Sequence, residues 1–216
     1  MRDFLVDREK MVEDIRQRYG LDAPYVFSAM FQVPREEFAP KSYKQDAYRD
    51  GPNPIGYGQT MSQPYTVCFM THLLIGGEKS SDWKVLEVGT GSGYQAAILS
   101  RLAKKIYTVE IIKDLAEKAK ERLKKLGYKN VEVKVGSGEW GWREKAPFDG
   151  IIVTAGLGEK VPEALFDQLK EGGFLVAPMG RGYDKVMTKF VKLKNAKIEK
   201  QEYGIFNFVP FVEEPN

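Results

Sequence analysis

Cysteine and histidine are almost missing from this chain of 216 residues, because each occurs only once, as Cys68 and His72. A single cysteine excludes an internal disulfide and a cysteine metal cluster. A single histidine excludes multi-histidine metal sites, and it leaves Ser-His-Asp or Cys-His catalysis to His72 alone. We expect both residues to be structural, with Cys68 a small buried apolar residue. One cysteine also favours the reducing cytoplasm as the location.

Long apolar runs and a large charge imbalance are also absent. No apolar run approaches the roughly 20 residues that a membrane span needs, and the first twenty residues are too charged for a signal peptide. A net charge of +3, from 33 basic and 30 acidic residues, gives no reason to expect a nucleic-acid partner. A hydrophobic content of 43% excludes a disordered chain. We expect a monomer without membrane or nucleic-acid partners.

The length fits one domain, 1–216, in which three parts follow one another. Residues 1–75 are predicted to be helical with an irregular middle, and an apolar face formed by Leu5, Val12, Ile15 and Tyr19 indicates the first helix, which Gly20 ends. Two more helices are expected at 24–32 and 64–74, the latter opened by Pro64. Residues 49–63 are expected to be loop.

Residues 76–180 alternate between strand and helix signals, which indicates a doubly wound, mostly parallel sheet. The predicted strands are 85–88, 106–110, 131–135, 148–154 and 174–177, and the predicted helices follow the glycines to about residue 103 and occupy 113–126 and 162–170. Residues 181–216 carry strand signals at 185–193, 197–203 and 205–209 without a long helix between them. The simplest interpretation is an antiparallel edge that completes an α/β sheet.

The turn Glu87-Val-Gly-Thr-Gly-Ser-Gly93 lies between a predicted strand and a predicted helix, where bare backbone can approach a ligand. The dinucleotide pattern needs a third glycine at the position that Tyr94 occupies, so a nicotinamide enzyme is disfavoured. The spacing of these glycines instead resembles the class I methyltransferase turn, whose ligand is S-adenosylmethionine. Glu110 ends the next predicted strand, where a carboxylate can accept both ribose hydroxyls.

Six stretches together resemble one family, the protein-L-isoaspartate O-methyltransferases, over most of the chain. The most specific is Pro54-Ile-Gly-Tyr-Gly-Gln-Thr-Met-Ser-Gln-Pro-Tyr65. The others are Val33-Pro-Arg-Glu-Glu-Phe-Ala-Pro40, Ala47-Tyr-Arg-Asp50, Val85-Leu-Glu-Val-Gly-Thr-Gly-Ser-Gly-Tyr-Gln-Ala-Ala97, Ala146-Pro-Phe-Asp-Gly-Ile-Ile-Val-Thr-Ala155 and Phe208-Val-Pro-Phe211. The resemblance implies a class I fold, S-adenosylmethionine as methyl donor, and the free α-carboxylate of an isoaspartyl residue in a damaged protein as acceptor.

The resemblance also assigns site residues. It implies Ser62 as the catalytic residue, which holds the acceptor carboxylate, and Thr60, Phe208 and Val209 as further substrate contacts. The residues that it implies for the cofactor are Thr60, Gln63, Tyr65, Glu87, Gly89, Gly91, Glu110, Ile111, Ser137 and Gly138. The acceptor chemistry agrees with the composition, since a carboxylate with a pKa near 3.5 to 4 is an anion at neutral pH and needs no general base.

Several interpretations stay open at this point. Ser62 lies two residues before Pro64 and could cap the helix there instead of, or as well as, binding substrate. Asp50 could organise the loop or simply form a turn before Gly51. Trp140 and Trp142 could line the adenine pocket or fill the core.

Two departures from the family pattern concern the binding sites. Gly136-Ser-Gly138 stands where the family usually has Gly-Asp-Gly, so the uncharged Ser137 would lose about 1 kcal/mol of adenine binding. Phe206-Asn-Phe-Val-Pro-Phe211 stands where many relatives have Val-Arg-Phe-Val-Pro-Leu, which could alter peptide preference. Two other functions therefore remain as alternatives, a methyltransferase for another peptide carboxylate and a non-catalytic sensor of damaged peptides.

Overall fold

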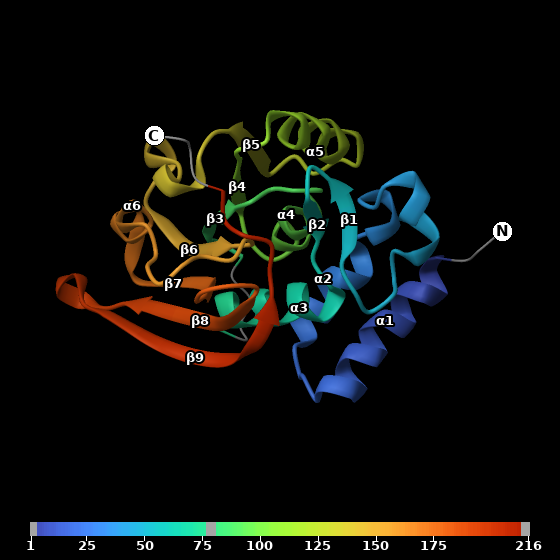
Figure 1. Cartoon of the computed structure of the whole chain (residues 1–216), viewed down its shortest axis with the longest axis horizontal. Helices are drawn as coiled ribbons and strands as arrows, with labels where there is room; N and C mark the ends of the chain where they lie inside the picture. The colour runs from blue at the N-terminus through green and yellow to red at the C-terminus, as the bar shows by residue number, and fades with distance from the viewer. Residues whose placement is uncertain (1–3, 77–80, 213–216) are drawn as a thin grey trace.

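A seven-stranded sheet covered by helices on both faces forms the centre of the molecule (Figure 1). The computed structural model describes residues 4–76 and 81–212. The strands lie in the order β5-β4-β3-β6-β7-β8-β9. Their bounds are β3 Lys84–Val88, β4 Lys105–Glu110, β5 Val131–Val135, β6 Phe148–Val153, β7 Leu169–Met179, β8 Asp184–Lys192 and β9 Ile198–Asn207.

The first five of these strands are parallel, and β8 and β9 form an antiparallel edge, as the sequence predicted. The chain runs from β3 outward to β5 and then returns to β6, so the strand order reverses between β3 and β6. Ligands in open α/β sheets bind beyond the carboxyl ends of the strands at such a reversal. The fold therefore directs attention to the segments after Val88 and Val153.

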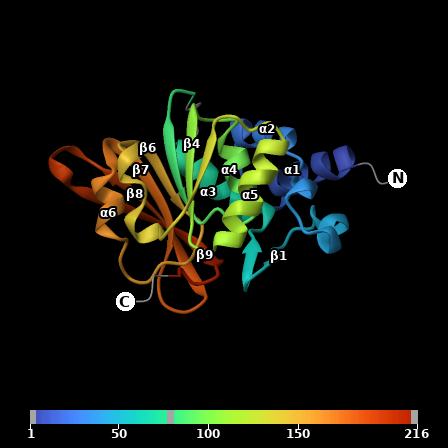
Figure 2. The ribbon, with the colours of Figure 1, turned by 90° about the horizontal axis from the view of Figure 1, so that it is seen from above.

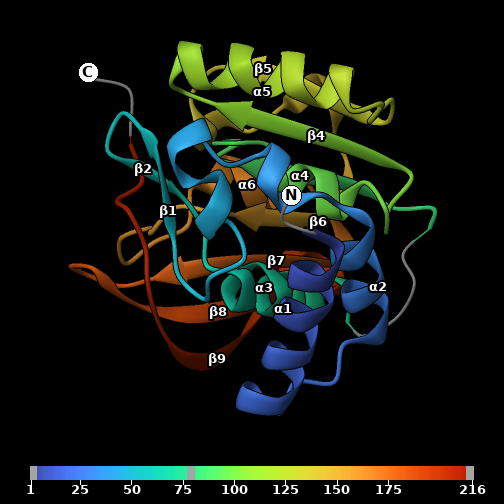
Figure 3. The same ribbon diagram turned by 90° about the vertical axis from the view of Figure 1, so that its right-hand side faces the viewer.

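Most helices cover one face of the sheet, and α6 covers the other (Figure 2). The helices are α1 Phe4–Tyr19, α2 Pro24–Gln32, α3 Pro64–Ile75, α4 Tyr94–Leu99, α5 Lys113–Lys125 and α6 Glu163–Asp167. The short 3-10 helices are η1 Arg35–Glu37, η2 Lys41–Asp46, η3 Gly138–Trp140, η4 Arg143–Lys145 and η5 Lys194–Ala196. Figure 3 shows α1, α2 and α3 packed together in front of the sheet. Among the described residues, no helix is long and apolar enough to cross a membrane.

Three predictions about local structure were wrong. Residues 49–63 are not all loop, because β1 Asn53–Gly56 and β2 Gln59–Met61 form a hairpin. The two final strands predicted at 197–203 and 205–209 are one strand, β9, with an irregular register opposite Val186 and Thr188. The face predicted for α1 is only partly correct, since Ile15 is buried while Leu5 and Tyr19 are 54% and 39% exposed.

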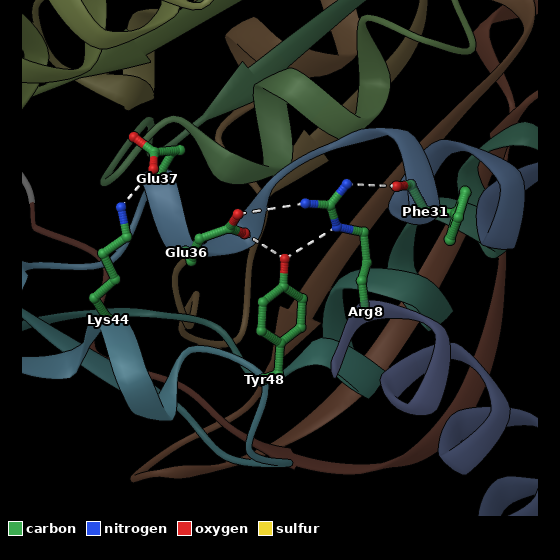
Figure 4. Close-up of polar contacts among 6 residues, drawn as sticks. All are labelled: Arg8, Phe31, Glu36, Glu37, Lys44 and Tyr48. Carbon is green, nitrogen blue, oxygen red and sulfur yellow. Dashed lines mark hydrogen bonds and ion pairs between the residues drawn. The ribbon is translucent and has the colours of Figure 1, made fainter. Parts of the chain in front are cut away.

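A buried polar network fixes α1 to the segment that follows α2 (Figure 4). The guanidinium of Arg8 donates to the Tyr48 hydroxyl (3.0 Å), to the Phe31 carbonyl (2.9 Å) and to a carboxylate oxygen of Glu36 (3.4 Å). The Tyr48 hydroxyl donates in turn to Glu36. Arg8 and Glu36 are both less than 10% exposed. Figure 4 also shows the adjacent Glu37, whose ion pair with Lys44 is exposed.

The neighbours Glu36 and Glu37 therefore provide a matched test of the network. Glu36→Gln should lower the free energy of unfolding by about 3 kcal/mol, because the substitution leaves the buried Arg8 charge without an opposite charge. Glu37→Gln should lower it by less than about 1 kcal/mol, because the pair with Lys44 is exposed to solvent. Urea unfolding of both variants measures the difference, and equal effects would contradict the assignment.

Candidate functional site

The loop after β3 is built from glycines that the local geometry requires. Gly89, Gly91 and Gly93 have φ angles of +98°, +51° and +87°, which other residues adopt only with strain. A Cβ at Gly89 would also lie 2.4 Å from the hydroxyl oxygen of Thr154, at the end of β6. That hydroxyl donates to the carbonyls of Val88 (3.1 Å) and Gly89 (2.6 Å), so the ends of the two strands at the reversal are tied together.

Glu110, at the end of β4, holds this loop in place. One carboxylate oxygen accepts from the Gly91 amide (2.8 Å), and the other accepts from the Ile112 amide (3.0 Å). The side chain lies on the wall of a cavity that the glycine loop also lines. A carboxylate oxygen has room for more than one hydrogen bond, so Glu110 can still accept from ligand hydroxyls.

The cavity at the strand reversal, here called the cofactor cavity, is lined by residues from distant parts of the chain. Its lining consists of Gln59, Thr60, Val88, Gly89, Gly91, Val109, Glu110, Ile111, Ile112, Gly138, Thr154, Ala155, Val209, Pro210, Phe211 and Val212. The hairpin β1–β2 and the segment after β9 therefore both contribute to it. Gly138 fits closely, because a Cβ there would lie 2.3 Å from Val88 and 3.1 Å from Phe211.

A second hollow, here called the acceptor groove, lies beside the cofactor cavity and measures about 580 Å³. It is lined by Tyr19, Pro52, Thr60, Ser62, Gln63, Tyr65, Thr66, Thr154, Gly204, Ile205, Phe206, Asn207, Phe208 and Val209. Thr60, Thr154 and Val209 line both hollows. A third, small cavity is lined by Ser62, as the groove is, and by Gly89 and Gly91, as the cofactor cavity is. A molecule in the groove would therefore lie next to one in the cofactor cavity.

Arg35 positions the backbone of Ser62. Its side chain is completely buried, and its guanidinium donates to the carbonyls of Ser62 (2.8 Å) and Ala47 (2.6 Å) and to the Asn53 side chain (3.4 Å). The cation also lies 4.8 Å from the ring centre of Tyr94, the first residue of α4. Burial lowers the pKa of Arg35, but arginine stays charged at any physiological pH.

A family model described as protein-L-isoaspartate(D-aspartate) O-methyltransferase matches residues 6–216. The chain belongs to this family. A protein-L-isoaspartate O-methyltransferase of Opitutus terrae is 45% identical over 96% of this chain and 88% of its own length. A protein-L-isoaspartate O-methyltransferase 2 of Syntrophobacter fumaroxidans is 53% identical over 80% of this chain and 72% of its own length.

Solved structures agree with the family assignment. One protein-L-isoaspartate O-methyltransferase superposes with a TM-score of 0.82 and 31% identity, over 94% of this chain and 65% of that one. A putative protein-L-isoaspartate O-methyltransferase from Plasmodium falciparum, solved in complex with S-adenosyl-L-homocysteine, has a TM-score of 0.82 and 25% identity over 95% and 98% of the two chains. The α/β methyltransferase fold that the sequence predicted is thus confirmed.

The residues that the sequence assigned to the isoaspartate methyltransferase site fall into three groups. Six of the ten assigned to the cofactor line the cofactor cavity: Thr60, Gly89, Gly91, Glu110, Ile111 and Gly138. Gln63 and Tyr65 line the acceptor groove instead. All four residues assigned to the substrate, Thr60, Ser62, Phe208 and Val209, line the groove. Glu87 and Ser137 are buried and line neither hollow.

Ser137, which replaces the usual family aspartate, lies beside a carboxylate of this chain. The Ser137 side chain accepts from the Glu139 amide (3.3 Å) and lies 3.2 Å from a carboxylate oxygen of Glu139. Glu139 therefore places a carboxylate beside Ser137, and an aspartate at position 137 would meet this carboxylate at close range.

The structure bears on the open interpretations of four polar and aromatic residues. Ser62 is not the cap of α3, because Gln63 holds that position and no side chain caps the helix. Asp50 organises the loop, since its two oxygens accept from the Tyr19 hydroxyl (2.5 Å) and the Gln63 amide (2.9 Å). Trp142 packs against the core through Tyr107 (ring centres 5.4 Å apart), whereas Trp140 is 57% exposed.

The two residues that were expected to be structural are both on α3. Cys68 is completely buried, as predicted. His72 is partly buried, and burial lowers the pKa of its imidazole. Neither residue lines the cofactor cavity or the acceptor groove.

Sequence reasoning missed Thr154, Arg35 and Tyr19 as parts of the site. Thr154 had a usable signal, because it directly follows the strand next to the glycine turn. Arg35 and Tyr19 had none, because only the tertiary fold brings α1 and η1 to the hairpin.

Glu87 lies completely buried beneath the glycine loop, in β3. Among the described residues, both of its carboxylate oxygens lack a hydrogen-bond partner of good geometry. Burial raises the pKa of Glu87 to about 8, an effect that the Thr108 hydroxyl opposes and the charge of Glu110 reinforces. The carboxyl group is therefore mostly protonated at neutral pH in the folded protein without ligands.

The raised pKa predicts a specific pH dependence of stability. Between about pH 4.5 and 8 the folded state keeps a proton that the unfolded state releases, so stability falls as the pH rises through this window. The slope for one proton is about 1.4 kcal/mol per pH unit. In the Glu87→Gln variant the side chain at this position cannot ionise. The free energy of unfolding of the variant, minus that of the unsubstituted protein, should therefore increase steadily from pH 5 to 8 when both are unfolded in urea. The half-exposed Glu139→Gln is the control, and a difference independent of pH for Glu87→Gln would contradict the assignment.

Proposed function

We propose that this protein methylates the free α-carboxylate of L-isoaspartyl residues in damaged proteins and peptides, with S-adenosylmethionine as donor, as the first step of their repair. The observation that carries the proposal is the wall, formed by Thr60, Thr154 and Val209, that the cofactor cavity shares with the acceptor groove, which Ser62 also lines. The family assignment supports the same reaction.

The residues of the cofactor cavity fit this donor. Glu110 offers carboxylate oxygens to a ribose, and the glycine loop leaves space that a Cβ at Gly91 would restrict, since it would lie 3.3 Å from Ile55. The apolar side chains of Ile111 and Phe211 suit a flat aromatic base. When bound, S-adenosylmethionine supplies an activated methyl group, whose transfer to a carboxylate oxygen neither needs nor releases a proton.

The remaining task of the chain is to orient the acceptor. The Ser62 hydroxyl donates a hydrogen bond to the acceptor carboxylate, and Thr60 provides a second hydroxyl residue in the lining of the groove. A hydrogen bond to a charged group contributes about 1.5–3 kcal/mol. Correct orientation of two reactants can contribute roughly 7–11 kcal/mol to a reaction of this kind. The segment of Phe208 and Val209 holds the backbone of the acceptor peptide along the groove.

The partners and the organisation of the protein follow from this proposal. Isoaspartyl-containing proteins are its substrates, residues 1–216 act as one methyltransferase domain, and the protein works as a cytoplasmic monomer. The contribution of all three parts of the chain to the site supports a single domain. Residues 1–3, 77–80 and 213–216 of that domain lie outside the described residues.

A peptide assay tests the function. Methyl-labelled S-adenosylmethionine and an isoaspartyl peptide should yield a base-labile methyl ester, whereas the matched aspartyl peptide should not. Ser62→Ala should lower kcat about 10-fold to 100-fold, as expected for the loss of one hydrogen bond to a charged group. Calorimetry should show unchanged binding of S-adenosyl-L-homocysteine.

Ser28→Ala is the control, because this serine is exposed on α2 and lies outside both hollows. If the isoaspartyl peptide took up no more methyl label than the matched aspartyl peptide, the proposed activity would be ruled out. Unchanged kcat in Ser62→Ala would leave the activity in place and remove Ser62 from it.

A further inference from the structure

One wall of the acceptor groove is a continuous stack of aromatic rings. Tyr19, at the end of α1, stacks on Tyr65 with ring centres 3.7 Å apart and an angle of 7° between the planes. Tyr65 continues to Phe206 of β9 at 5.8 Å and 20°. Phe69 lies behind both rings, at 5.7 Å from Tyr65 and 5.4 Å from Phe206. Tyr19, Tyr65 and Phe206 line the groove, so the aromatic wall faces the space beside Ser62.

The polar groups at the Tyr19 end of this wall satisfy one another. The Tyr19 hydroxyl donates to one Asp50 oxygen (2.5 Å), and the Gln63 amide donates to the other (2.9 Å) and to the Tyr19 hydroxyl (3.1 Å). Burial and the bond to Asp50 raise the pKa of Tyr19 to about 12, so the phenol stays neutral. With its hydroxyl engaged, Tyr19 offers a bound peptide mainly its ring.

An irregularity in β9 turns Phe206 toward the wall. Val186 pairs with Ile205 and Thr188 pairs with Glu202, so β9 has one residue more than β8 between these pairs. Residues three apart in a regular strand point to opposite faces. The extra residue lets Tyr203 and Phe206 both reach Phe69, at 5.8 and 5.4 Å between ring centres. Such bulges redirect side chains beside active sites.

We propose that the aromatic wall is a subsite for a large apolar or aromatic side chain of the acceptor peptide, within two residues of the isoaspartyl residue. The occupant must be part of the acceptor, because the wall shares one groove with Ser62 and Thr60 and continues directly from them. Ile205, which lines the same groove, is 71% exposed and adds a further apolar contact. The inference rests on the proposed function and specifies its substrate preference.

A set of isoaspartyl peptides tests the subsite. One peptide has only glycine and serine around the isoaspartyl residue, and four others carry a single phenylalanine at one of the two positions on either side. At one of these positions, phenylalanine should raise kcat/KM about tenfold, the size of effect expected when an apolar pocket is filled. The gain should appear mainly as a lower KM, because the wall binds the peptide and does not touch the reacting carboxylate.

Two variants connect the gain to the wall. Phe206→Val keeps a residue suited to a strand but shortens the wall, and Tyr19→Ala removes its other end. Each should reduce the phenylalanine gain to about threefold or less. In Phe206→Val, which removes no hydrogen bond of the loop around Ser62, kcat/KM for the glycine–serine peptide should change by less than about twofold. Tyr25→Ala is the matched control, because Tyr25 is a 45% exposed tyrosine on α2 outside the groove.

The outcomes separate this inference from the proposed function. Methylation of every isoaspartyl peptide at the same rate would overturn the subsite and leave the function intact. A phenylalanine gain that survives both Phe206→Val and Tyr19→Ala would also overturn it. Absence of methylation in all isoaspartyl peptides would overturn the proposed function and the subsite together.

Discussion

The buried guanidinium of Arg35 is the interaction on which the acceptor side of this protein depends. Among the described residues, its hydrogen bonds go to neutral oxygens of three separate segments, at Ala47, Asn53 and Ser62. A buried charge is costly unless hydrogen bonds satisfy it, so these three segments cannot separate without exposing or stranding the cation. Because the same cation lies over Tyr94, the helix that follows the glycine loop is included in the arrangement. The position of Ser62 relative to the cofactor cavity thus has a physical cause far from Ser62 in the sequence.

The cofactor cavity and the acceptor groove depend on different kinds of contact. For this reason the sequence predicted the first much better than the second. The cofactor cavity depends on steric requirements at single positions, such as Gly89 against Thr154 and Gly138 against Val88. Such requirements leave glycines at fixed distances from strand ends, so the parallel sheet, the glycine turn and Glu110 could be identified from spacing alone. The acceptor groove depends on contacts between α1, the hairpin, α3 and β9, and none of these contacts has a sequence period. Tyr19 was assigned to the apolar face of a helix, and its actual position in the groove follows from tertiary packing.

The errors in local structure have the same origin. Residues 49–63 contain glycine and proline at positions typical of loops, yet Asn53–Gly56 and Gln59–Met61 pair because Arg35 and Asp50 hold the residues on either side. The extra residue in β9 divided one strand signal into two, since a bulge interrupts the alternation on which strand prediction relies. Both deviations contribute to the lining of the acceptor groove, through Thr60 of the hairpin and Gly204 of β9. The family resemblance could name Ser62, but only the tertiary fold shows what holds it.

The charges of the site are consistent with a reaction that requires positioning and no proton transfer. Among the described residues, the acceptor groove is lined by hydroxyl, amide, aromatic and aliphatic side chains and by no carboxylate. Asp50, which contacts the lining residues Tyr19 and Gln63, has both of its oxygens engaged by them. Free carboxylates in the groove would repel an anionic acceptor, whereas hydroxyl donors orient it without that cost. In the cofactor cavity, by contrast, the lining includes the carboxylate of Glu110, which suits a positively charged donor. The cofactor cavity therefore suits a cation and the acceptor groove suits an anion, and the two hollows share a wall at Thr60 and Thr154, where their ligands lie nearest to each other.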